Sequence, residues 1–199
     1  MREMQLIQQV MEDKGGIMKT ADFVALGINN SEIIRLWEKG ELLKVKHGYY
    51  RLAEYGAPRA TEIIAHLFPD GILSMDTALY FYGYRNGPPQ EWVLTLNRNI
   101  ARSRLKLDYP TLKIYLVEEK YLNVGVSKVK INGTPMKMYN RERVICDCFR
   151  YRNKIQPETF NYAIKMYMAD PRKNSKNLPE YAKDLRIYNR IKDVLGVLC

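Results

Sequence analysis

The segment ELLKVKHGYYRL, residues 41–52, constrains the fold of this chain more than any other. Two short runs of alternating residues flank His47 and Gly48, a pattern that predicts a β-hairpin with a tight turn. Successive strand residues alternate faces, so the apolar and basic residues of the first run are expected on opposite sides. Leu43 and Val45 are expected on one face of the strand, and Lys44 and Lys46 on the other.

Three short helices are predicted before this hairpin, because apolar residues recur three and four positions apart and glycines separate the segments. The first helix carries Met4, Ile7, Val10 and Met11 and ends at Gly15-Gly16. The second has Thr20 as its N-cap and Asp22 in its first turn, and it ends at Gly27. The third runs from Glu32 to Lys39.

The third helix is expected to have a buried side and an exposed side. Ile33 and Trp37, four residues apart, are predicted to face inward, whereas Glu32, Arg35 and Lys39 share the opposite face. Two helices joined by a short glycine-containing turn are typical of helix-turn-helix DNA readers, and a basic hairpin directly after them is typical of a winged helix. A small helical bundle with an ordinary solvated hairpin is the alternative.

A winged helix would contact DNA through the third helix and the hairpin. Arg35 is the predicted base reader, because a guanidinium can bond guanine O6 and N7 together. Polar groups at the helix start could bond phosphates or adenine, and the basic residues beyond it would position the duplex. Tyr49 and Tyr50 are expected to support the hairpin by packing. The candidate DNA-binding residues are Asn29, Asn30, Ser31, Arg35, Lys39, Lys44, Lys46, His47 and Arg51.

The charge distribution predicts a second basic surface. The net charge is +10 and the pI is about 9.4, which favours a polyanionic partner. Residues 1–55 hold eight basic and eight acidic residues, so the excess comes from the rest of the chain. The basic residues that give this excess could form a solvated loop or a surface that binds DNA or RNA. The candidates are Arg98, Arg102, Arg104, Lys106, Lys183, Arg186 and Arg190.

The remaining chain is predicted to form a second domain, so we expect domains at residues 1–56 and 57–199. Its pattern indicates an α+β fold with a small mixed sheet and C-terminal helices. The expected strands are 92–96, 112–117, 126–131 and 135–139, the last two joined by the hairpin turn Asn132-Gly133, and the expected helices are 58–68, one capped by Ser74, 141–151, one from Pro157, and one from about Pro179 that aligns Tyr181, Leu185, Tyr188 and Leu195.

No cofactor, metal site or disulfide is predicted. The cysteines are expected to be reduced, buried thiols, and the two histidines lie far from them in the sequence. No segment is long and apolar enough to cross a membrane, so a cytoplasmic protein is expected. A metal-dependent nuclease is the enzymatic alternative, because Asp108, Glu118 and Lys120 resemble a carboxylate-lysine nuclease pattern. The cysteines are Cys146, Cys148 and Cys199.

The order of three segments resembles the AbiEi-like antitoxins and transcriptional regulators of type IV toxin-antitoxin (abortive infection) systems. These segments are GELLKVKHGYYRL, GILSMDTALYFYG and MKMYNRERVICDCFR. The resemblance covers most of the chain, without residues 97–111 and the tail after Asp170. It implies a phage-defence protein that is not an enzyme and carries an N-terminal winged helix.

The same resemblance implies two activities. The winged helix would repress the protein's own operon by binding inverted repeats in promoter DNA. The C-terminal domain would counter a nucleotidyltransferase toxin of the AbiEii type without a stable complex, and the second basic surface could then bind DNA, tRNA or the toxin's nucleotide substrate. A module that binds only RNA or protein is the remaining alternative.

Overall fold

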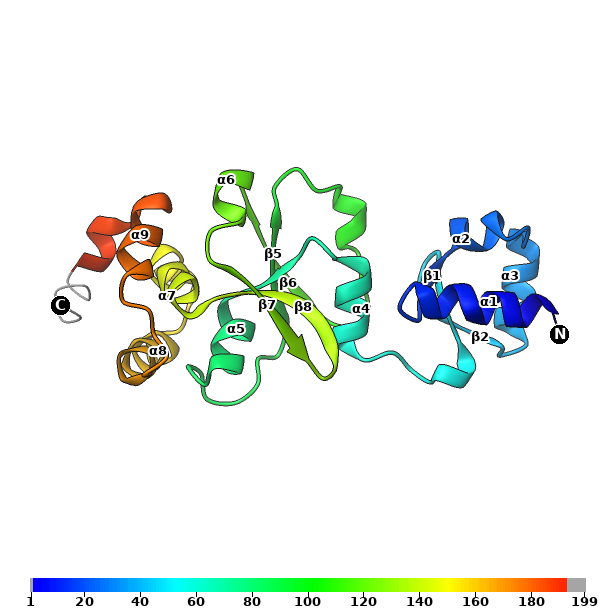
Figure 1. Ribbon diagram of the computed structural model, residues 1–199, viewed down its shortest axis with the longest axis horizontal. Helices are drawn as coiled ribbons and strands as arrows, with labels where there is room; N and C mark the ends of the chain where they lie inside the picture. Colours follow the sequence, from blue (N-terminus) through cyan, green and yellow to red (C-terminus); the bar gives the residue numbers. More distant parts are fainter. Residues whose placement is uncertain (1, 193–199) are drawn as a thin grey trace. The chain divides into compact units, whose positions relative to one another are not determined.

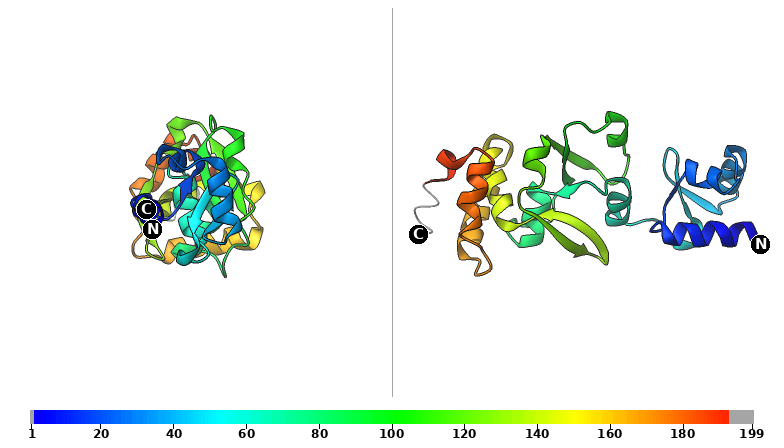
Figure 2. Two further views of the ribbon diagram at one scale, coloured as in Figure 1. Left: turned by 90° about the vertical axis from the view of Figure 1, so that its right-hand side faces the viewer. Right: turned by 45° about the horizontal axis from the view of Figure 1, so that its top comes forward.

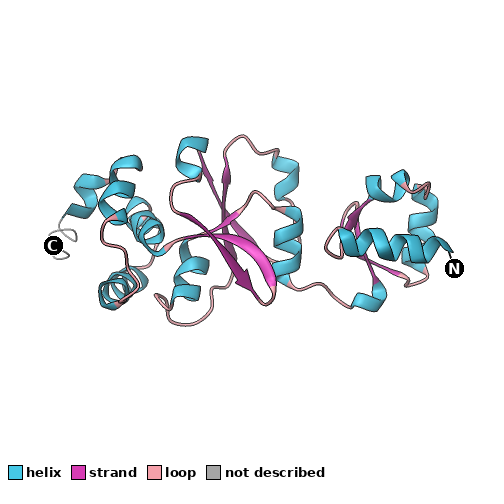
Figure 3. Cartoon of the chain, viewed as in Figure 1, coloured by secondary structure: helices cyan, strands magenta, loops and turns pink. Residues whose placement is uncertain are grey.

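The computed structural model describes residues 2–192, and their side chains from Met4 onward (Figure 1). The chain divides into two compact units. Unit 1 runs to Pro69 and includes Leu107–Pro110, and unit 2 comprises Asp70–Lys106 and the chain from Thr111 onward. Helices and sheets occur in both units, so the predicted α+β class is confirmed (Figure 3).

Unit 1, coloured mostly blue to cyan in Figure 2, combines short helices with a small sheet. This sheet has three antiparallel strands in the order β1-β3-β2. The predicted hairpin is present as β2 and β3, with a turn at His47 and Gly48, where Gly48 has φ +75°. The elements are α1 (Arg2–Asp13), β1 (Met18–Lys19), α2 (Thr20–Ala25), α3 (Asn30–Glu38), β2 (Leu42–Lys46), β3 (Tyr49–Leu52), the short 3-10 helix η1 (Ala53–Tyr55) and α4 (Ala60–Leu67).

The core of unit 1 joins α1, α2, α3 and the sheet. Ile7 and Met11, one helical turn apart on α1, are fully buried, as their spacing predicted. The backbone N–H of Leu52 donates to Sδ of Met11 at 3.1 Å, which ties β3 to α1. Other buried members are Met18, Phe23, Ile28, Ile33, Leu36, Leu42, Tyr50 and Leu52.

The structure corrects two expectations in this core. Trp37 was expected inside, but it is 43% exposed, and Leu36, which is 5% exposed, packs inward beside Ile33 instead. On the hairpin, Leu42 faces the core, and it pairs with Leu52 across the strands. Leu43 and Val45, expected on one apolar face, are only half-buried. Successive strand residues alternate faces, so Leu43 lies on the side opposite the buried Leu42, and the strand register shifts between Lys44 and Lys46.

The start of α2 also differs from the prediction. The helix begins at Thr20 rather than after it, and Lys19 occupies the N-cap position. Asp22, in the first turn, accepts a hydrogen bond from the backbone N–H of Lys19 at 2.9 Å, so its carboxylate satisfies this N–H group at the start of the helix. The Thr20 hydroxyl donates to the Gly48 carbonyl at 3.3 Å and links α2 to the hairpin turn.

Unit 2 is built on a five-stranded mixed sheet of order β6-β5-β4-β8-β7, which confirms the predicted mixed sheet (Figure 3). The pairs β4–β8 and β5–β6 are parallel, and β4–β5 and β7–β8 are antiparallel. The elements are β4 (Ile72–Leu73), α5 (Met75–Tyr82), β5 (Trp92–Asn97), η2 (Arg102–Leu105), β6 (Leu112–Val117), α6 (Glu119–Leu122), β7 (Val126–Ile131), β8 (Thr134–Tyr139), α7 (Arg141–Arg150), η3 (Arg152–Lys154), α8 (Pro157–Ala169) and α9 (Asn177–Asp184).

Helix α7 is central to unit 2, where it contacts α5, α8 and α9 (Figure 1). Seven consecutive residues, 142–148, are buried, so this helix is surrounded rather than amphipathic. Asn140 caps it by accepting from the backbone N–H of Arg143 at 3.0 Å. Cys146 and Cys148 are fully buried free thiols, as expected, and burial raises the pKa of both. Cys199 lies outside the described residues.

Two further predictions on unit 2 need correction. Ser74 precedes α5, but its side chain does not cap the helix; it is buried and accepts a hydrogen bond from the Thr95 hydroxyl at 2.9 Å. The last helix is not continuous, because α9 ends at Asp184 and Arg186 adopts a φ of +57°, before helical residues resume at 188–192. Leu195, predicted on the same face, lies outside the described residues.

Candidate nucleic-acid interface

The exposed face of α3 carries most of the predicted DNA-binding residues. The Asn29 side chain accepts a hydrogen bond from the backbone N–H of Glu32 at 3.0 Å and caps the helix. Asn29, Asn30, Ser31 and Arg35 are all exposed. The burial of Ile33 and Leu36 on the opposite side anchors the helix, so these polar groups are displayed on a fixed scaffold.

The guanidinium of Arg35 lies on the surface of α3. Its side chain is 56% exposed, and Nη2 lies 3.2 Å from Oε1 of Glu32. Such a solvent-exposed pair contributes less than about 1 kcal/mol and is screened by salt. The guanidinium can therefore exchange Glu32 for a base edge or a phosphate at small cost.

The hairpin continues the exposed surface of α3. Nζ of Lys44 lies 5.3 Å from the centroid of the exposed Trp37 ring, which connects β2 to the last turn of α3. Lys39, the C-cap of α3, is exposed, as is His47 at the hairpin turn. Nζ of Lys46 lies 5.5 Å from the Tyr49 ring. The helix and the hairpin thus present cations and an aromatic ring side by side.

Tyr49 and Tyr50 support the hairpin, as predicted. Tyr50 is 9% exposed and packs edge-on against Phe23 with ring centroids 6.1 Å apart. Tyr49 is half-buried and makes a similar contact with His66 of α4 at 6.2 Å. The aromatic rings therefore hold the hairpin against the rest of unit 1.

Arg51 does not fit the predicted role as an exposed DNA contact. It is 9% exposed, and its Nη1 bonds Oε2 of Glu62 at 2.9 Å while Nη2 donates to the Tyr55 carbonyl at 3.2 Å. These bonds connect β3 to α4 and to η1 within unit 1. We therefore leave Arg51 out of the candidate interface.

The Arg51–Glu62 pair predicts a pH-dependent stability of unit 1. Burial alone raises the pKa of Glu62, but hydrogen bonds from Arg59 and Arg51 outweigh it and lower the pKa from 4.5 to about 2. A lowered folded-state pKa gives stability that is present above the unfolded value and is lost as pH falls toward the folded value. We expect Glu62→Gln to remove this pH dependence, on the order of 1–2 kcal/mol between pH 7 and pH 3.

The chain has two tryptophans, Trp37 in unit 1 and Trp92 in unit 2, so each unit carries its own fluorescent reporter. Urea unfolding at pH 7 and pH 3 in a Trp92→Phe background measures the effect on unit 1. Glu54→Gln, at an exposed carboxylate, is the control. Equal losses of stability on acidification with and without Glu62 would contradict the assignment.

The residues of the predicted second basic surface all lie in unit 2, but they have different neighbours. Arg98 pairs with Glu118 at 3.3 Å, and Arg186 is close enough to Glu118 to help lower its pKa, after the larger effect of Lys120. Arg104 pairs instead with Asp70 at 2.7 Å. Arg102 and Arg190 are exposed. Arg98 and Arg104 therefore have different acidic partners within unit 2.

A group of exposed lysines on the β7–β8 hairpin was not among the basic residues predicted from the sequence. Lys128 and Lys137 are directly opposite each other in the strand register, and both are exposed, as is Lys130. Like charges opposite each other on a sheet are destabilising. The alternation in VSKVKI and PMKMY contained this signal, because residues at alternate positions share one face.

The nuclease pattern is not assembled as a metal site among the described residues. No group of three His, Cys, Asp or Glu side chains is placed there to hold a metal ion. Nζ of Lys120 lies 2.7 Å from Oε2 of Glu118, so these two groups pair on the surface.

Comparisons with known proteins find a family match in the N-terminal part of the chain. Residues 5–53 match the family described as "Transcriptional regulator, AbiEi antitoxin", which confirms the predicted family resemblance over this part of the chain. The matched segment begins in α1 and ends just after β3, so it contains the whole candidate interface. A comparison with curated proteins finds no match.

The comparison with solved structures finds chains of similar fold. The crystal structure of the RV2827C protein from Mycobacterium tuberculosis has a TM-score of 0.61 and 12% sequence identity, and the similarity covers 96% of this chain and 79% of that chain. At this identity the likeness shows the fold alone. Within the described residues, no helix has the length and apolar character needed to cross a bilayer.

Proposed function

We propose that unit 1 is a winged helix-turn-helix that binds double-stranded DNA. The order α1, β1, α2, α3, β2, β3 and the sheet order β1-β3-β2 support this assignment, because α2 and α3 are joined by a short turn and the hairpin follows α3 directly. Helix α3 would enter the major groove, and the hairpin would contact the backbone beside it. The adjacency of Lys44 and Trp37 is the observation that carries this proposal.

We infer that the protein is an antitoxin and autorepressor of a type IV toxin-antitoxin system. The family match over residues 5–53 supports a regulator that is also an antitoxin. DNA binding is assigned to residues 1–56, and counteraction of an AbiEii-type nucleotidyltransferase toxin to residues 57–199. The protein acts on its own operon, without catalysis, in the cytoplasm. The antitoxin role of residues 57–199 rests on the resemblance.

A mobility-shift experiment tests the DNA-binding role. The purified protein is expected to bind its own promoter, with its inverted repeats, more tightly than a scrambled duplex of equal length. Affinity is expected to fall steeply as salt rises, because cations that neutralise phosphates release counterions. Equal affinity for both duplexes would favour an RNA- or protein-binding module instead.

Arg35→Ala is expected to weaken binding to the promoter by about 1–3 kcal/mol and to reduce discrimination against scrambled DNA, because a base contact is lost. Lys44→Gln is the matched comparison on the hairpin. It is expected to weaken binding to both duplexes by the same factor, since it removes a phosphate contact. The slope of log affinity against log salt concentration is expected to become shallower by about one. Fluorescence anisotropy at several salt concentrations measures both quantities. If each variant changed the affinity for the promoter and for the scrambled duplex by the same factor, the assignment of Arg35 to base reading would be wrong.

The two proposed activities can be separated in the same chain. A strain that expresses the cognate toxin together with full-length Arg35→Ala protein is expected to survive, while a promoter reporter is derepressed. Loss of both repression and protection, from a protein that remains folded and equally abundant, would contradict the division of labour between residues 1–56 and 57–199.

A further inference from the structure

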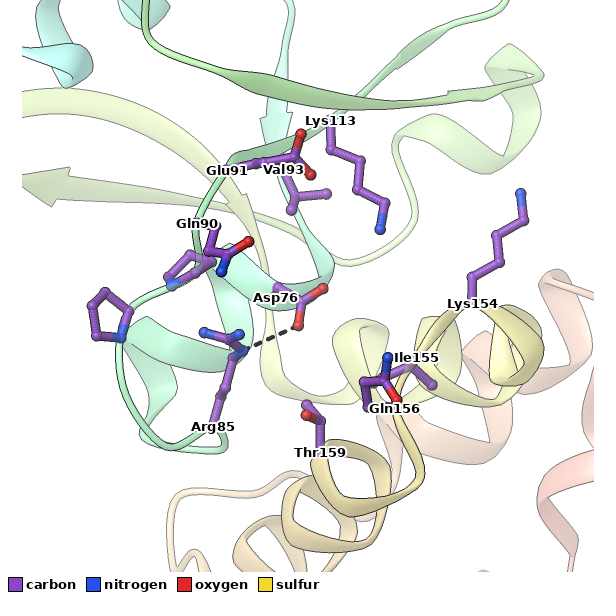
Figure 4. Close-up of a pocket in the computed structure, with 12 residues that line it drawn as sticks. Asp76, Arg85, Gln90, Glu91, Val93, Lys113, Lys154, Ile155, Gln156 and Thr159 are labelled. Atoms are coloured by element: carbon purple, nitrogen blue, oxygen red, sulfur yellow. Dashed lines mark ion pairs between the residues drawn. The ribbon is translucent and has the colours of Figure 1, made fainter.

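Unit 2 contains a polar pocket that the proposed function does not use. Its volume is about 380 Å³. It lies where α5, the loop before β5, strand β6 and the start of α8 meet (Figure 4). Its polar and charged lining residues include Asp76, Arg85, Gln90, Glu91, Lys113 and Lys154.

Two lysines in this pocket lack an acidic partner within ion-pair distance among the described residues. The ammonium groups of Lys113 and Lys154 lie 6.0 Å and 5.6 Å from the centroid of the same ring, that of the buried Tyr115. Both lysines line the pocket; in Figure 4 the Lys113 side chain points toward the other lining residues, and the Lys154 side chain extends along one side of them. A ring face attracts an ammonium group but accepts no ordinary hydrogen bond from its three N–H donors. These donors are therefore available to an anionic ligand.

The third cation of the pocket is held in place by a carboxylate. Nε of Arg85 lies 3.2 Å from Oδ1 of Asp76, and Arg85 Nη1 also donates to the Gly87 carbonyl at 3.0 Å. Glu91 is the other acidic lining residue. With three basic and two acidic side chains the lining is weakly positive, which suits a ligand of one or two negative charges better than a polyanion.

The start of α8 reinforces this preference. Gln156 is the N-cap, its side chain makes no cap hydrogen bond, and Pro157 follows at the first helical position. Gln156 and Thr159 both line the pocket, so the first turn of this 13-residue helix borders it. Backbone N–H groups and the helix dipole at such an end favour a negative charge.

We propose that this pocket binds a phosphate monoester. Lys113 and Lys154 would bind the phosphate oxygens through charge-assisted hydrogen bonds, and Gln90, Gln156 and Thr159 would bond the rest of the ligand. The pocket is a second ligand site, separate from the DNA interface of unit 1. The phosphate can belong to a small molecule such as a sugar phosphate or to the 5′ end of a nucleic acid strand.

Isothermal titration of the full-length protein with ribose 5-phosphate and with inorganic phosphate tests the site, with sulfate and chloride at equal ionic strength as controls. We expect saturable binding of ribose 5-phosphate. Lys113→Gln and Lys154→Gln are each expected to weaken it about tenfold or more, because each removes a charged donor. Lys128→Gln, an equal loss of charge at an exposed position outside the pocket, is expected to leave the affinity unchanged.

A pair of short oligonucleotides, with a 5′-phosphate or a 5′-hydroxyl, distinguishes the two sources of the phosphate. Preference for the phosphorylated strand over ribose 5-phosphate, lost in Lys113→Gln, identifies a nucleic acid end as the ligand. The proposal is overturned if ribose 5-phosphate and the phosphorylated strand bind no better than chloride, or if the Lys113 and Lys154 variants, folded by circular dichroism, bind as tightly as Lys128→Gln. Promoter binding by unit 1 is not required for any of these outcomes.

Discussion

Arg143→Ala is expected to destabilise unit 2 by about 3–5 kcal/mol, the cost of leaving one charge of a buried pair without its partner. The Arg143 side chain is 1% exposed, and its Nε bonds Oδ2 of Asp147 at 3.1 Å. Nη1 donates to the carbonyls of Tyr121 and Val124 at 2.6 and 2.7 Å, and the guanidinium lies 3.9 Å from the Tyr139 ring centroid. The substitution removes all of these contacts at once.

Urea unfolding in a Trp37→Phe background, followed through Trp92, measures this effect on unit 2. Arg102→Ala, which removes an exposed arginine, is the control and is expected to change the free energy of unfolding by less than about 0.5 kcal/mol. The double variant Arg143→Met, Asp147→Leu is expected to recover part of the loss, because it leaves no unpaired charge but still removes the donor to the Tyr121 and Val124 carbonyls. A loss below about 1 kcal/mol for Arg143→Ala would show that this cluster does not stabilise unit 2.

Gly125→Ala is expected to have the second large effect, because the added methyl group would collide with α7. A Cβ at position 125 would lie 2.6 Å from Cβ of Arg143 and 3.0 Å from Oδ1 of Asn140, the residue that caps this helix. Neither neighbour can move easily, since Arg143 is buried and the Asn140 N–H donates to the Gly125 carbonyl at 2.7 Å.

Gly87 offers a matched control for the backbone part of this effect. Both glycines have a φ of +71°, but a Cβ at position 87 would meet nothing within 4 Å. Gly87→Ala is expected to cost about 1–2 kcal/mol for the left-handed backbone alone. Gly125→Ala is expected to cost about 1–3 kcal/mol more, because of the collision. Unfolding curves monitored through Trp92 compare the two, and equal losses would contradict the steric explanation.

Most elements of unit 2 could be predicted from local patterns. Strands β6 and β7 have the predicted bounds, because alternating residues and the Asn132-Gly133 turn define them. Strand β4, only two residues long, carries too short a pattern to recognise. The break after α9 depends on Arg186 in the left-handed region, and an arginine gives no signal for that conformation.

The candidate interface was predictable in its location but not in every side chain. Capping by Asn29 and the exposure of Arg35 follow from residue type and helical spacing. Trp37 and Leu36 both fit an inward stripe with Ile33, and only tertiary packing decides that Leu36 is buried. The burial of Arg51 depends on Glu62, eleven residues later in the next helix, and no local pattern reveals that partner.

The most direct test of the central proposal is a titration of the isotopically labelled full-length protein with promoter duplex, followed by amide chemical shifts. The proposal predicts that the largest changes occur in α3, residues 30–38, and in the hairpin, residues 42–52, with a half-saturation that shifts as salt is raised. Changes confined to unit 2, with the α3 and hairpin amides unaffected at saturating DNA, would contradict it.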